Sequence, residues 1–303
     1  MISGISLMCF SASYAASLLL EISRLFFRMP VRLVFIVGFT VAGLIAQTLY
    51  LIYRAQTGQA IGLPLSTWYD WYLLAAWILA ATYLVVLVRK PQTNVGIFML
   101  PVVQVLIGVA YLFRNYEPFE RSQAVQIWGM AHGIMLLLGT VSVSLGFIAG
   151  LMYLAQSYRL KQKLPPRQGL KLPSLEWLQN VNKQALIYSS FCIALGLVAG
   201  IVLNMIRTRQ PLPWTDPIII TSGLLLIWLL TATAFEWLYK PAQQGRKVAY
   251  LTVASFVFLA LVMALFVFGQ TEHTAPQGPA HGNASQSSLG DQRQSLVETR
   301  TGR

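Results

Sequence analysis

The sequence predicts an all-α, polytopic integral membrane protein with about eight transmembrane helices and a disordered C-terminal tail. Three observations support this fold class. Apolar residues make up 56% of the 303 residues and charged residues only 11%, whereas soluble domains carry roughly 25% charged residues. The apolar residues form blocks of about 20, which is the length needed to cross a hydrocarbon core about 30 Å thick. The net charge of +12 is spread over short loops, so we expect no nucleic-acid partner.

Eight segments have the length and composition of membrane spans. They are residues 2–20, 33–53, 68–88, 94–113, 126–157, 184–206, 217–238 and 248–269. The first is rich in Ser and Ala, and its charged residues follow it rather than precede it, which favours an uncleaved helix over a signal peptide. We therefore expect a membrane domain over residues 1–270. Residues 271–303 form a polar tail with too few large apolar residues to fold.

Helix-ending residues separate the spans. The breaks after the second, third and fourth spans hold Gly58, Gly62 and Pro64, then Arg89, Lys90 and Pro91, then Arg114, Glu117, Pro118 and Glu120. The fifth helix is expected to continue past the bilayer into a basic stretch that Pro165 and Pro166 end. A loop at 172–176 then leads into a short amphipathic segment, with Ser174 as its N-cap and Trp177 as an interfacial anchor.

The distribution of Lys and Arg predicts the orientation. Fourteen of the 22 basic residues fall on one side of the predicted membrane and eight on the other, including the tail. Because cytoplasmic loops carry the excess of basic residues, the side with 14 is assigned to the cytoplasm. The protein is then expected to cross the plasma (inner) membrane with both termini extracytoplasmic. The loops at about 54–67, 114–125 and 207–216 are also outside.

His132 is the most informative residue for chemistry. It lies a few positions inside the outer end of the fifth span, where a titratable group is costly unless it is paired, hydrated or bound. One interpretation is a structural histidine satisfied by a hydroxyl or carbonyl of a neighbouring helix, and the other is a metal or haem ligand. Cys9 and Cys192 form no Cys-x-x-Cys pair, and no nucleotide-binding or hydrolase motif is present.

Small residues surround His132 and continue along the same helix. They are Gly129, Gly133, Gly139, Ser142, Gly146 and Gly150, and we expect them to keep one side of the helix nearly free of side chains. Such a side admits a second helix at close range, or a flat porphyrin. Gly196 and Gly200 repeat the spacing in the sixth span, which is therefore the expected packing partner.

The predicted topology places further residues on the outer face with His132. Trp214 and Asp216 precede the seventh span, and His273 follows the eighth. Trp68 and Trp71 flank Asp70 before the third span, where aromatic residues usually anchor a helix at the membrane interface.

The order of these elements resembles the cytochrome c assembly protein family, which includes the CcsA/ResC, CcmC and HemX-like membrane proteins. The resemblance covers residues from about the third span onward, and it rests on elements of the sequence between 128 and 268. They are His132 opening a long helix, the stretch 152–163, Leu-Pro-Ser-Leu at 172–175, a Trp-x-Asp-Pro segment at 214–217, and Gly-Arg-Lys at 245–247. The single Trp-x-Asp-Pro segment is shorter than in most members and places the chain nearest the short HemX-like branch.

The resemblance implies a haem-handling site at the outer face. It implies that His132 and His273 supply the two axial ligands of haem iron, and that Trp214 and Asp216 belong to the haem-contacting segment. The cofactor is expected to be haem b, bound transiently. The implied function is to handle or present haem for attachment to apocytochrome c, beside a second cytochrome c assembly membrane subunit. That role is one of a non-enzymatic assembly factor or a subunit of a haem-ligating complex.

Two other functions stay open. One is a HemX-like membrane regulator or scaffold of a tetrapyrrole-biosynthesis enzyme, glutamyl-tRNA reductase, which binds no haem and uses the basic loop at 158–183. The other is a small-solute transporter. Against a transporter, the spans show almost no charged pairs, Glu236 being a lone charge near a helix end, and no inverted repeat.

Overall fold

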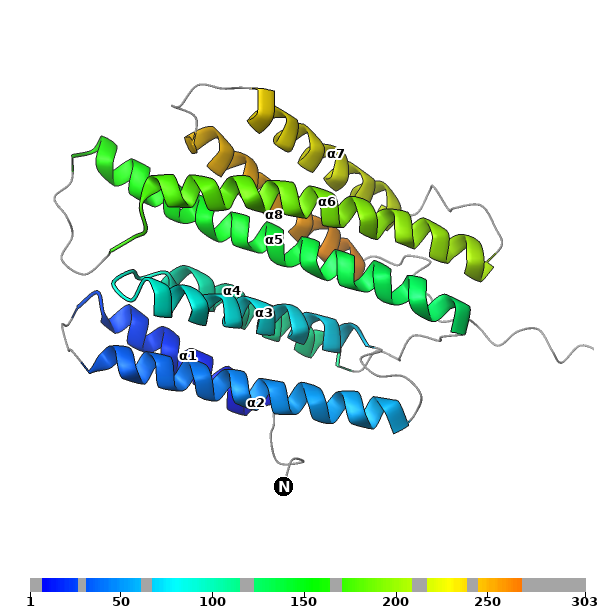
Figure 1. The fold of residues 1–303 in the computed structure, drawn as a ribbon, viewed down its shortest axis with the longest axis horizontal. Helices are drawn as coiled ribbons and strands as arrows, with labels where there is room; N and C mark the ends of the chain where they lie inside the picture. Colours follow the sequence, from blue (N-terminus) through cyan, green and yellow to red (C-terminus); the bar gives the residue numbers. More distant parts are fainter. Residues whose placement is uncertain are drawn as a thin grey trace, which may run out of the picture.

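The computed structural model describes residues 7–26, 31–60, 67–114, 123–163, 171–208, 217–238 and 245–268. These residues form eight α-helices and contain no strand (Figure 1). The helices are α1 (Leu7–Ser23), α2 (Arg32–Ala60), α3 (Trp68–Arg89), α4 (Gly96–Leu112), α5 (Gln123–Lys161), α6 (Leu175–Thr208), α7 (Pro217–Leu238) and α8 (Gly245–Phe268). Each contains most of one segment expected from the sequence. The tail at 271–303 lies outside the described residues.

The sixth helix differs from the expectation. The sequence suggested a short amphipathic segment followed by a separate span from 184, but α6 runs without a break from Leu175 for 34 residues. Ser174 caps it, as predicted, because its Oγ accepts a hydrogen bond from the Trp177 N–H at 3.4 Å. No Gly or Pro lies between 174 and 184, so no helix-breaking residue separates the amphipathic segment from the apolar segment that follows it.

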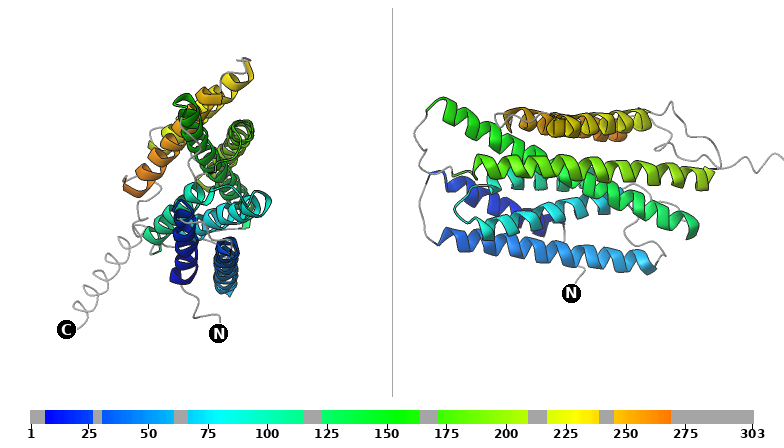
Figure 2. Two further views of the ribbon diagram at one scale, coloured as in Figure 1. Left: turned by 90° about the vertical axis from the view of Figure 1, so that its left-hand side faces the viewer. Right: turned by 45° about the horizontal axis from the view of Figure 1, so that its top comes forward.

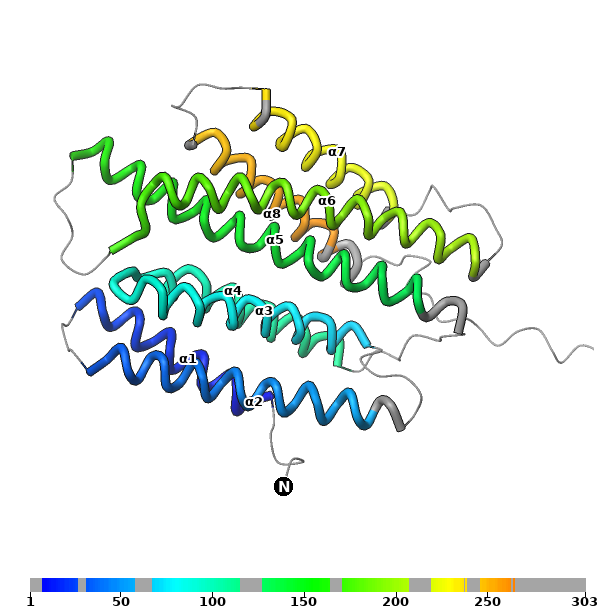
Figure 3. Tube along the Cα trace, in the orientation of Figure 1, coloured from blue at the N-terminus to red at the C-terminus, as the bar shows by residue number. Residues whose placement is uncertain are grey.

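The helices form two groups of four. In the N-terminal group, α1 and α3 each pack on both α2 and α4, and in the C-terminal group α5 and α7 each pack on both α6 and α8. The two groups lie side by side, with the helix axes close to parallel or antiparallel (Figures 1 and 2). The Cα trace shows α5 along the boundary, where it contacts α3 and α4 (Figure 3). α5 therefore joins the two groups.

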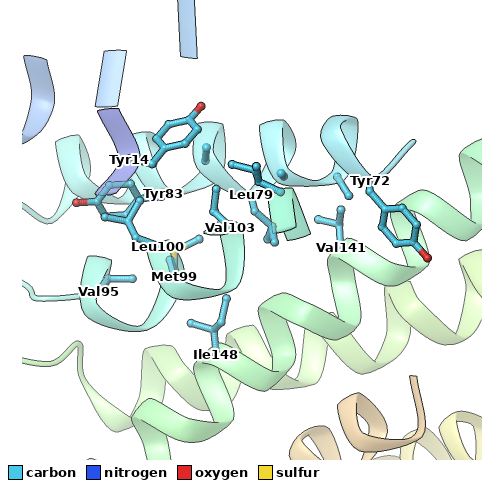
Figure 4. Packing of buried hydrophobic residues seen from close by; sticks show 14 of the residues in the cluster. Tyr14, Tyr72, Leu79, Tyr83, Val95, Met99, Leu100, Val103, Val141 and Ile148 are labelled. Carbon is cyan, nitrogen blue, oxygen red and sulfur yellow. The ribbon is translucent and has the colours of Figure 1, made fainter. Parts of the chain in front are cut away.

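Buried side chains from both groups meet at this boundary. Tyr14 of α1 and Tyr83 of α3 pack with Leu100 and Val103 of α4, and Ile148 of α5 extends the same cluster (Figure 4). All five side chains are at most 2% exposed. A second, smaller core lies among α5, α6, α7 and α8. The contact between the groups is therefore part of the main core.

The polarity of the structure is that of a helical membrane protein. Large apolar side chains stand on its outer surface, as with Ile45 of α2 and Phe191 of α6, which are 56% and 63% exposed. Polar side chains such as Ser17 and Gln47 are fully buried. Five helical stretches are long and apolar enough to cross a membrane: Arg32–Thr57, Trp68–Arg89, Ile127–Lys161, Leu175–Ile206 and Ile219–Glu236. α1 and α4 are shorter apolar helices of 17 residues each. This arrangement suits an apolar solvent around the bundle.

Candidate functional site

His132 contacts α6 directly. Its Nδ1 lies 2.7 Å from the carbonyl oxygen of Gly196. A carbonyl oxygen only accepts hydrogen bonds, so Nδ1 carries the proton and donates it. In the neutral imidazole the lone pair is then on Nε2. The contact expected of a histidine satisfied by the carbonyl of a neighbouring helix is therefore present, and the ligand interpretation stays a prediction.

Two glycines of α6 make room for His132 and for its neighbour on α5, Leu136. A Cβ atom on Gly200 would lie 2.8 Å from both Nδ1 and Cε1 of His132, and a Cβ on Gly196 would lie 2.8 Å from Leu136 Cδ2. Both distances are shorter than carbon and nitrogen atoms tolerate. The imidazole therefore fits against α6 because position 200 carries no side chain, and Leu136, one turn further along α5, fits because position 196 carries none.

The glycines of α5 pack against three helices, α3, α6 and α8, rather than against one. Gly139 packs against Ile193 of α6, as the sequence predicted, but Gly150 packs against Thr252 and the Ala249 carbonyl of α8. Gly133 packs against the Trp71 ring of α3, and a Cβ on Gly129 would meet nothing within 4 Å. The prediction that α6 is the packing partner is confirmed. The prediction of a single bare side is wrong, because the glycines occupy different angles around a helix of 3.6 residues per turn.

Trp71 lies at the same end of the bundle as His132. Its ring packs on α5, where a Cβ at Gly133 would lie 2.9 Å from Trp71 Cζ2. Gly133 directly follows His132 in α5, so the Trp71 ring of α3 contacts the residue next to His132. Trp71 is partly buried and packs on the main core, so it does more than anchor α3 at the interface.

A buried ion pair lies beside Trp71. Arg54 of α2 donates from Nε to Asp70 Oδ1, and Thr67 Oγ1 donates to Asp70 Oδ2 at 2.7 Å. The Arg54 guanidinium also lies 4.7 Å from the centroid of the Tyr69 ring. The Asp70 side chain is 4% exposed and that of Arg54 is 33% exposed. The sequence analysis missed this pair, although opposite charges at the two ends of the expected loop at about 54–67 were a usable signal.

The opposite end of the bundle holds a second ion pair. Glu21 Oε2 lies 3.5 Å from Arg24 Nη1, and Glu21 Oε1 accepts a hydrogen bond from the Tyr83 hydroxyl at 2.9 Å. Arg24 also donates from Nη2 to the Pro91 carbonyl at 2.8 Å. Glu21, Arg24 and Arg54 lie just outside the predicted spans 2–20 and 33–53, so both pairs agree with the expectation that the spans themselves hold almost no charged pairs. Both pairs are hydrogen-bonded to neighbouring helices or turns, which favours a structural role for them.

Of the four residues predicted for the site, the structure describes only His132. Trp214, Asp216 and His273 lie outside the described residues, so their prediction stays a prediction. Within the described ranges, no group of three or more His, Cys, Asp or Glu side chains is placed to hold a metal ion. Haem binding does not require such a cluster, because the porphyrin holds the iron and the protein supplies only axial ligands such as histidine.

Comparison with known proteins identifies no relative. No protein-family model, no curated protein sequence and no solved structure matches this chain.

Proposed function

We propose that the protein handles haem at the outer membrane face and presents it for attachment to apocytochrome c, with His132 as an axial ligand of the haem iron. The observation that supports this proposal is the hydrogen bond from His132 Nδ1 to the Gly196 carbonyl. Metal-binding histidines usually donate their second ring N–H to a carbonyl or carboxylate, which fixes the tautomer and orients the ring. The bond leaves the lone pair on Nε2, the atom that would coordinate iron.

The remaining ligands follow from the family resemblance. His273 is proposed as the second axial ligand, and Trp214 and Asp216 as contacts to the porphyrin. In this proposal haem is cargo, since the chain lacks the Cys pair that thiol chemistry on apocytochrome c would need. A second cytochrome c assembly subunit in the same membrane would supply that chemistry.

Absorption spectroscopy with haem tests the ligand. The protein, purified in detergent and titrated with haemin, is expected to give a Soret band that His132→Ala abolishes and His281→Ala leaves unchanged. His281 is a matched control because it is the one histidine without a proposed role. His132 also ties α5 to α6, so imidazole is added to His132→Ala, where return of the band separates ligand loss from unfolding. No band in the wild type, or an unchanged band in His132→Ala, would refute the proposal.

We further propose that all eight helices cross the plasma membrane and that the His132 end faces outside. Support comes from the distribution of basic residues and from the alternating directions of successive helices (Figure 1). The test uses a variant lacking Cys9 and Cys192, with single cysteines introduced at two exposed positions, Gln56 and Gln92. An impermeant maleimide added to intact cells is expected to label Gln56→Cys and not Gln92→Cys. The opposite pattern would place His132 on the cytoplasmic side.

One observation favours the regulatory alternative as a second candidate. α5 has 39 residues and α6 has 34, which corresponds to lengths of about 58 and 51 Å. A bilayer with its headgroups is about 40–45 Å thick, so these helices project beyond it. Arg159 and Lys161 lie in the last turn of α5. A regulator of glutamyl-tRNA reductase would use this basic projection, and deleting the gene would change the cellular level of that enzyme without changing cytochrome c.

A further inference from the structure

A basic junction forms where the α3–α4 turn meets the segment that enters α6. Asn94 donates from its backbone N–H to the Lys171 carbonyl at 2.8 Å, and its Oδ1 accepts from the Lys171 N–H at 3.1 Å. The Lys90 ammonium lies 4.0 Å from the centroid of the Trp177 ring. Two segments separated by about 80 residues thus bring Lys90 and Lys171 to one place.

Among the described residues, no ion pair neutralises the positive charge of this junction. Lys171 and Arg89 are exposed, and Lys90 is partly buried. No described carboxylate forms an ion pair with any of the three, since the ion pairs found at either end of the bundle join Glu21 to Arg24 and Asp70 to Arg54. Burial lowers the pKa of Lys90, as expected for an ammonium that loses water without gaining a counter-ion. An anion at this place would restore the missing charge balance.

A buried amide in the junction also lacks an acceptor. Asn94 is 1% exposed, and its Nδ2 has no hydrogen-bond partner among the described residues. A buried donor without a partner costs about 1–3 kcal/mol, so a water or an anion that accepts from this amide would be stabilising. The junction therefore combines positive charge with an unused hydrogen-bond donor.

The expected depth of the junction in the membrane indicates which kind of anion it would bind. α3 is apolar enough to span the membrane and ends at Arg89, immediately before Lys90. Val85 and Val88 in its last turn are 49% and 63% exposed, as expected for side chains that contact acyl chains. Trp177 is an aromatic residue of the kind found at the membrane interface. If α3 crosses the membrane, the end of the helix at Arg89 falls at the level of the lipid phosphates.

We propose that this junction binds the headgroup of an anionic phospholipid, with Lys90 and Lys171 contacting the phosphate and the last turn of α3 contacting the acyl chains. Basic sites between transmembrane helices are known to select anionic headgroups. An acidic protein segment would need charge but no apolar surface beside it, so Val85 and Val88 favour a lipid.

Native mass spectrometry of the protein in detergent tests the site, with phosphatidylglycerol and phosphatidylcholine as probes. Phosphatidylglycerol is expected to bind more tightly than phosphatidylcholine. The double variant Lys90→Gln/Lys171→Gln is expected to lose about 30-fold in affinity, from about 1 kcal/mol per basic residue. Lys183→Gln is the matched control, because Lys183 is exposed on α6 away from the junction. Lys171→Gln alone, at an exposed position, is expected to lose about fivefold and covers the case in which the double variant does not fold.

Three outcomes would overturn the proposal. They are equal binding of phosphatidylglycerol by wild type and Lys171→Gln, an equal loss in Lys183→Gln, and displacement of the lipid by poly-glutamate or inorganic phosphate at the same concentration as the lipid. Displacement by poly-glutamate would assign the junction to an acidic protein partner, and displacement by phosphate would assign it to a free anion.

Discussion

The two groups of four helices are held together in different ways. In the N-terminal group, close glycine contacts such as that of Gly43 with Tyr14 are accompanied by hydrogen bonds between buried side chains of neighbouring helices. In the C-terminal group, the contacts of α5 depend on glycines that let helix backbones approach closely. Side-chain hydrogen bonds also occur in the C-terminal group, as between Ser190 of α6 and Thr233 of α7 and between Asn182 of α6 and Thr252 of α8. The hydrogen bond from α5 to α6 runs instead from His132 to a backbone carbonyl, that of Gly196.

The hydrogen bonds of the N-terminal group are specific pairs. Tyr14 of α1 donates to Gln47 Oε1 of α2 at 2.7 Å, and Gln47 Nε2 donates to the Leu73 carbonyl of α3 at 3.0 Å. Ser17 and Thr40 hydroxyls lie 3.1 Å apart. Each bond joins one position to one other position. These pairs therefore fix the register of α1, α2 and α3.

The contacts of α5 with its neighbouring helices depend mainly on close van der Waals packing. In an apolar solvent the burial of apolar side chains contributes little to helix association, so close packing has to supply the attraction. The glycine contacts also bring helix backbone within reach of a side chain from the next helix. The Gly196 carbonyl accepts from His132 for this reason. The comparison shows that the glycine-rich helix is the one that carries the proposed ligand.

Breaking an ion pair of the N-terminal group is expected to have the largest effect. Arg54→Met leaves the buried Asp70 carboxylate without its counter-ion, and the free energy of unfolding is expected to fall by about 3 kcal/mol. Replacing both residues, in Arg54→Met/Asp70→Leu, is expected to cost less because no uncompensated charge remains. Unfolding in mixed micelles measures both variants. A double variant that is less stable than Arg54→Met would show that the pair contributes more than charge compensation.

Filling a glycine contact of α5 is expected to come next. A Cβ at Gly150 would lie 2.7 Å from Thr252 Oγ1 and 3.0 Å from the Ala249 carbonyl oxygen, and backbone cannot move aside easily. Gly150→Ala is expected to destabilise the protein by about 1–3 kcal/mol. Gly129→Ala on the same helix is the control, because its Cβ meets nothing. Equal melting temperatures for the two variants would contradict the close-packing account.

Removing one hydroxyl from the N-terminal group is expected to have the smallest effect. Tyr14→Phe keeps the ring in the core but leaves Gln47 Oε1 without its donor, which is expected to cost about 1 kcal/mol. The same unfolding assay measures it. If Tyr14→Phe were as stable as the wild type, the side-chain hydrogen bonds would not be what holds α1 on α2.

The helices could be predicted from the sequence, whereas their side-chain contacts could not. Apolar length and helix-ending residues indicate where each helix lies, and for this reason α7 spans the same residues as expected. The sequence analysis did not predict that the amphipathic segment and the sixth span form one continuous helix, because an N-cap at Ser174 can begin a short helix or a long one. Which glycine faces which helix depends on how eight helices pack, as Gly133 and Gly150 show.

Like the fold, the candidate site could be predicted from the sequence only in part. Intramembrane depth singled out His132, and the repeated spacing of Gly196 and Gly200 indicated its neighbour. The sequence did not predict that the imidazole itself lies between these two glycines, because this requires the relative rotation of α5 and α6. The pairing of Arg54 with Asp70 depends on how α2 and α3 are placed relative to one another, which no spacing rule fixes.

The haem affinity of Gly200→Ala, measured beside the wild type, tests the central claim most directly. This variant keeps His132 but places a Cβ 2.8 Å from its Nδ1 and Cε1, which would displace the ring from the Gly196 carbonyl. Loss of such a supporting contact typically costs 10–100-fold in metal affinity. The account predicts a loss of at least about tenfold in haem affinity for Gly200→Ala and none for Gly223→Ala, whose Cβ meets nothing. Equal haem affinities of wild type and Gly200→Ala would contradict the account.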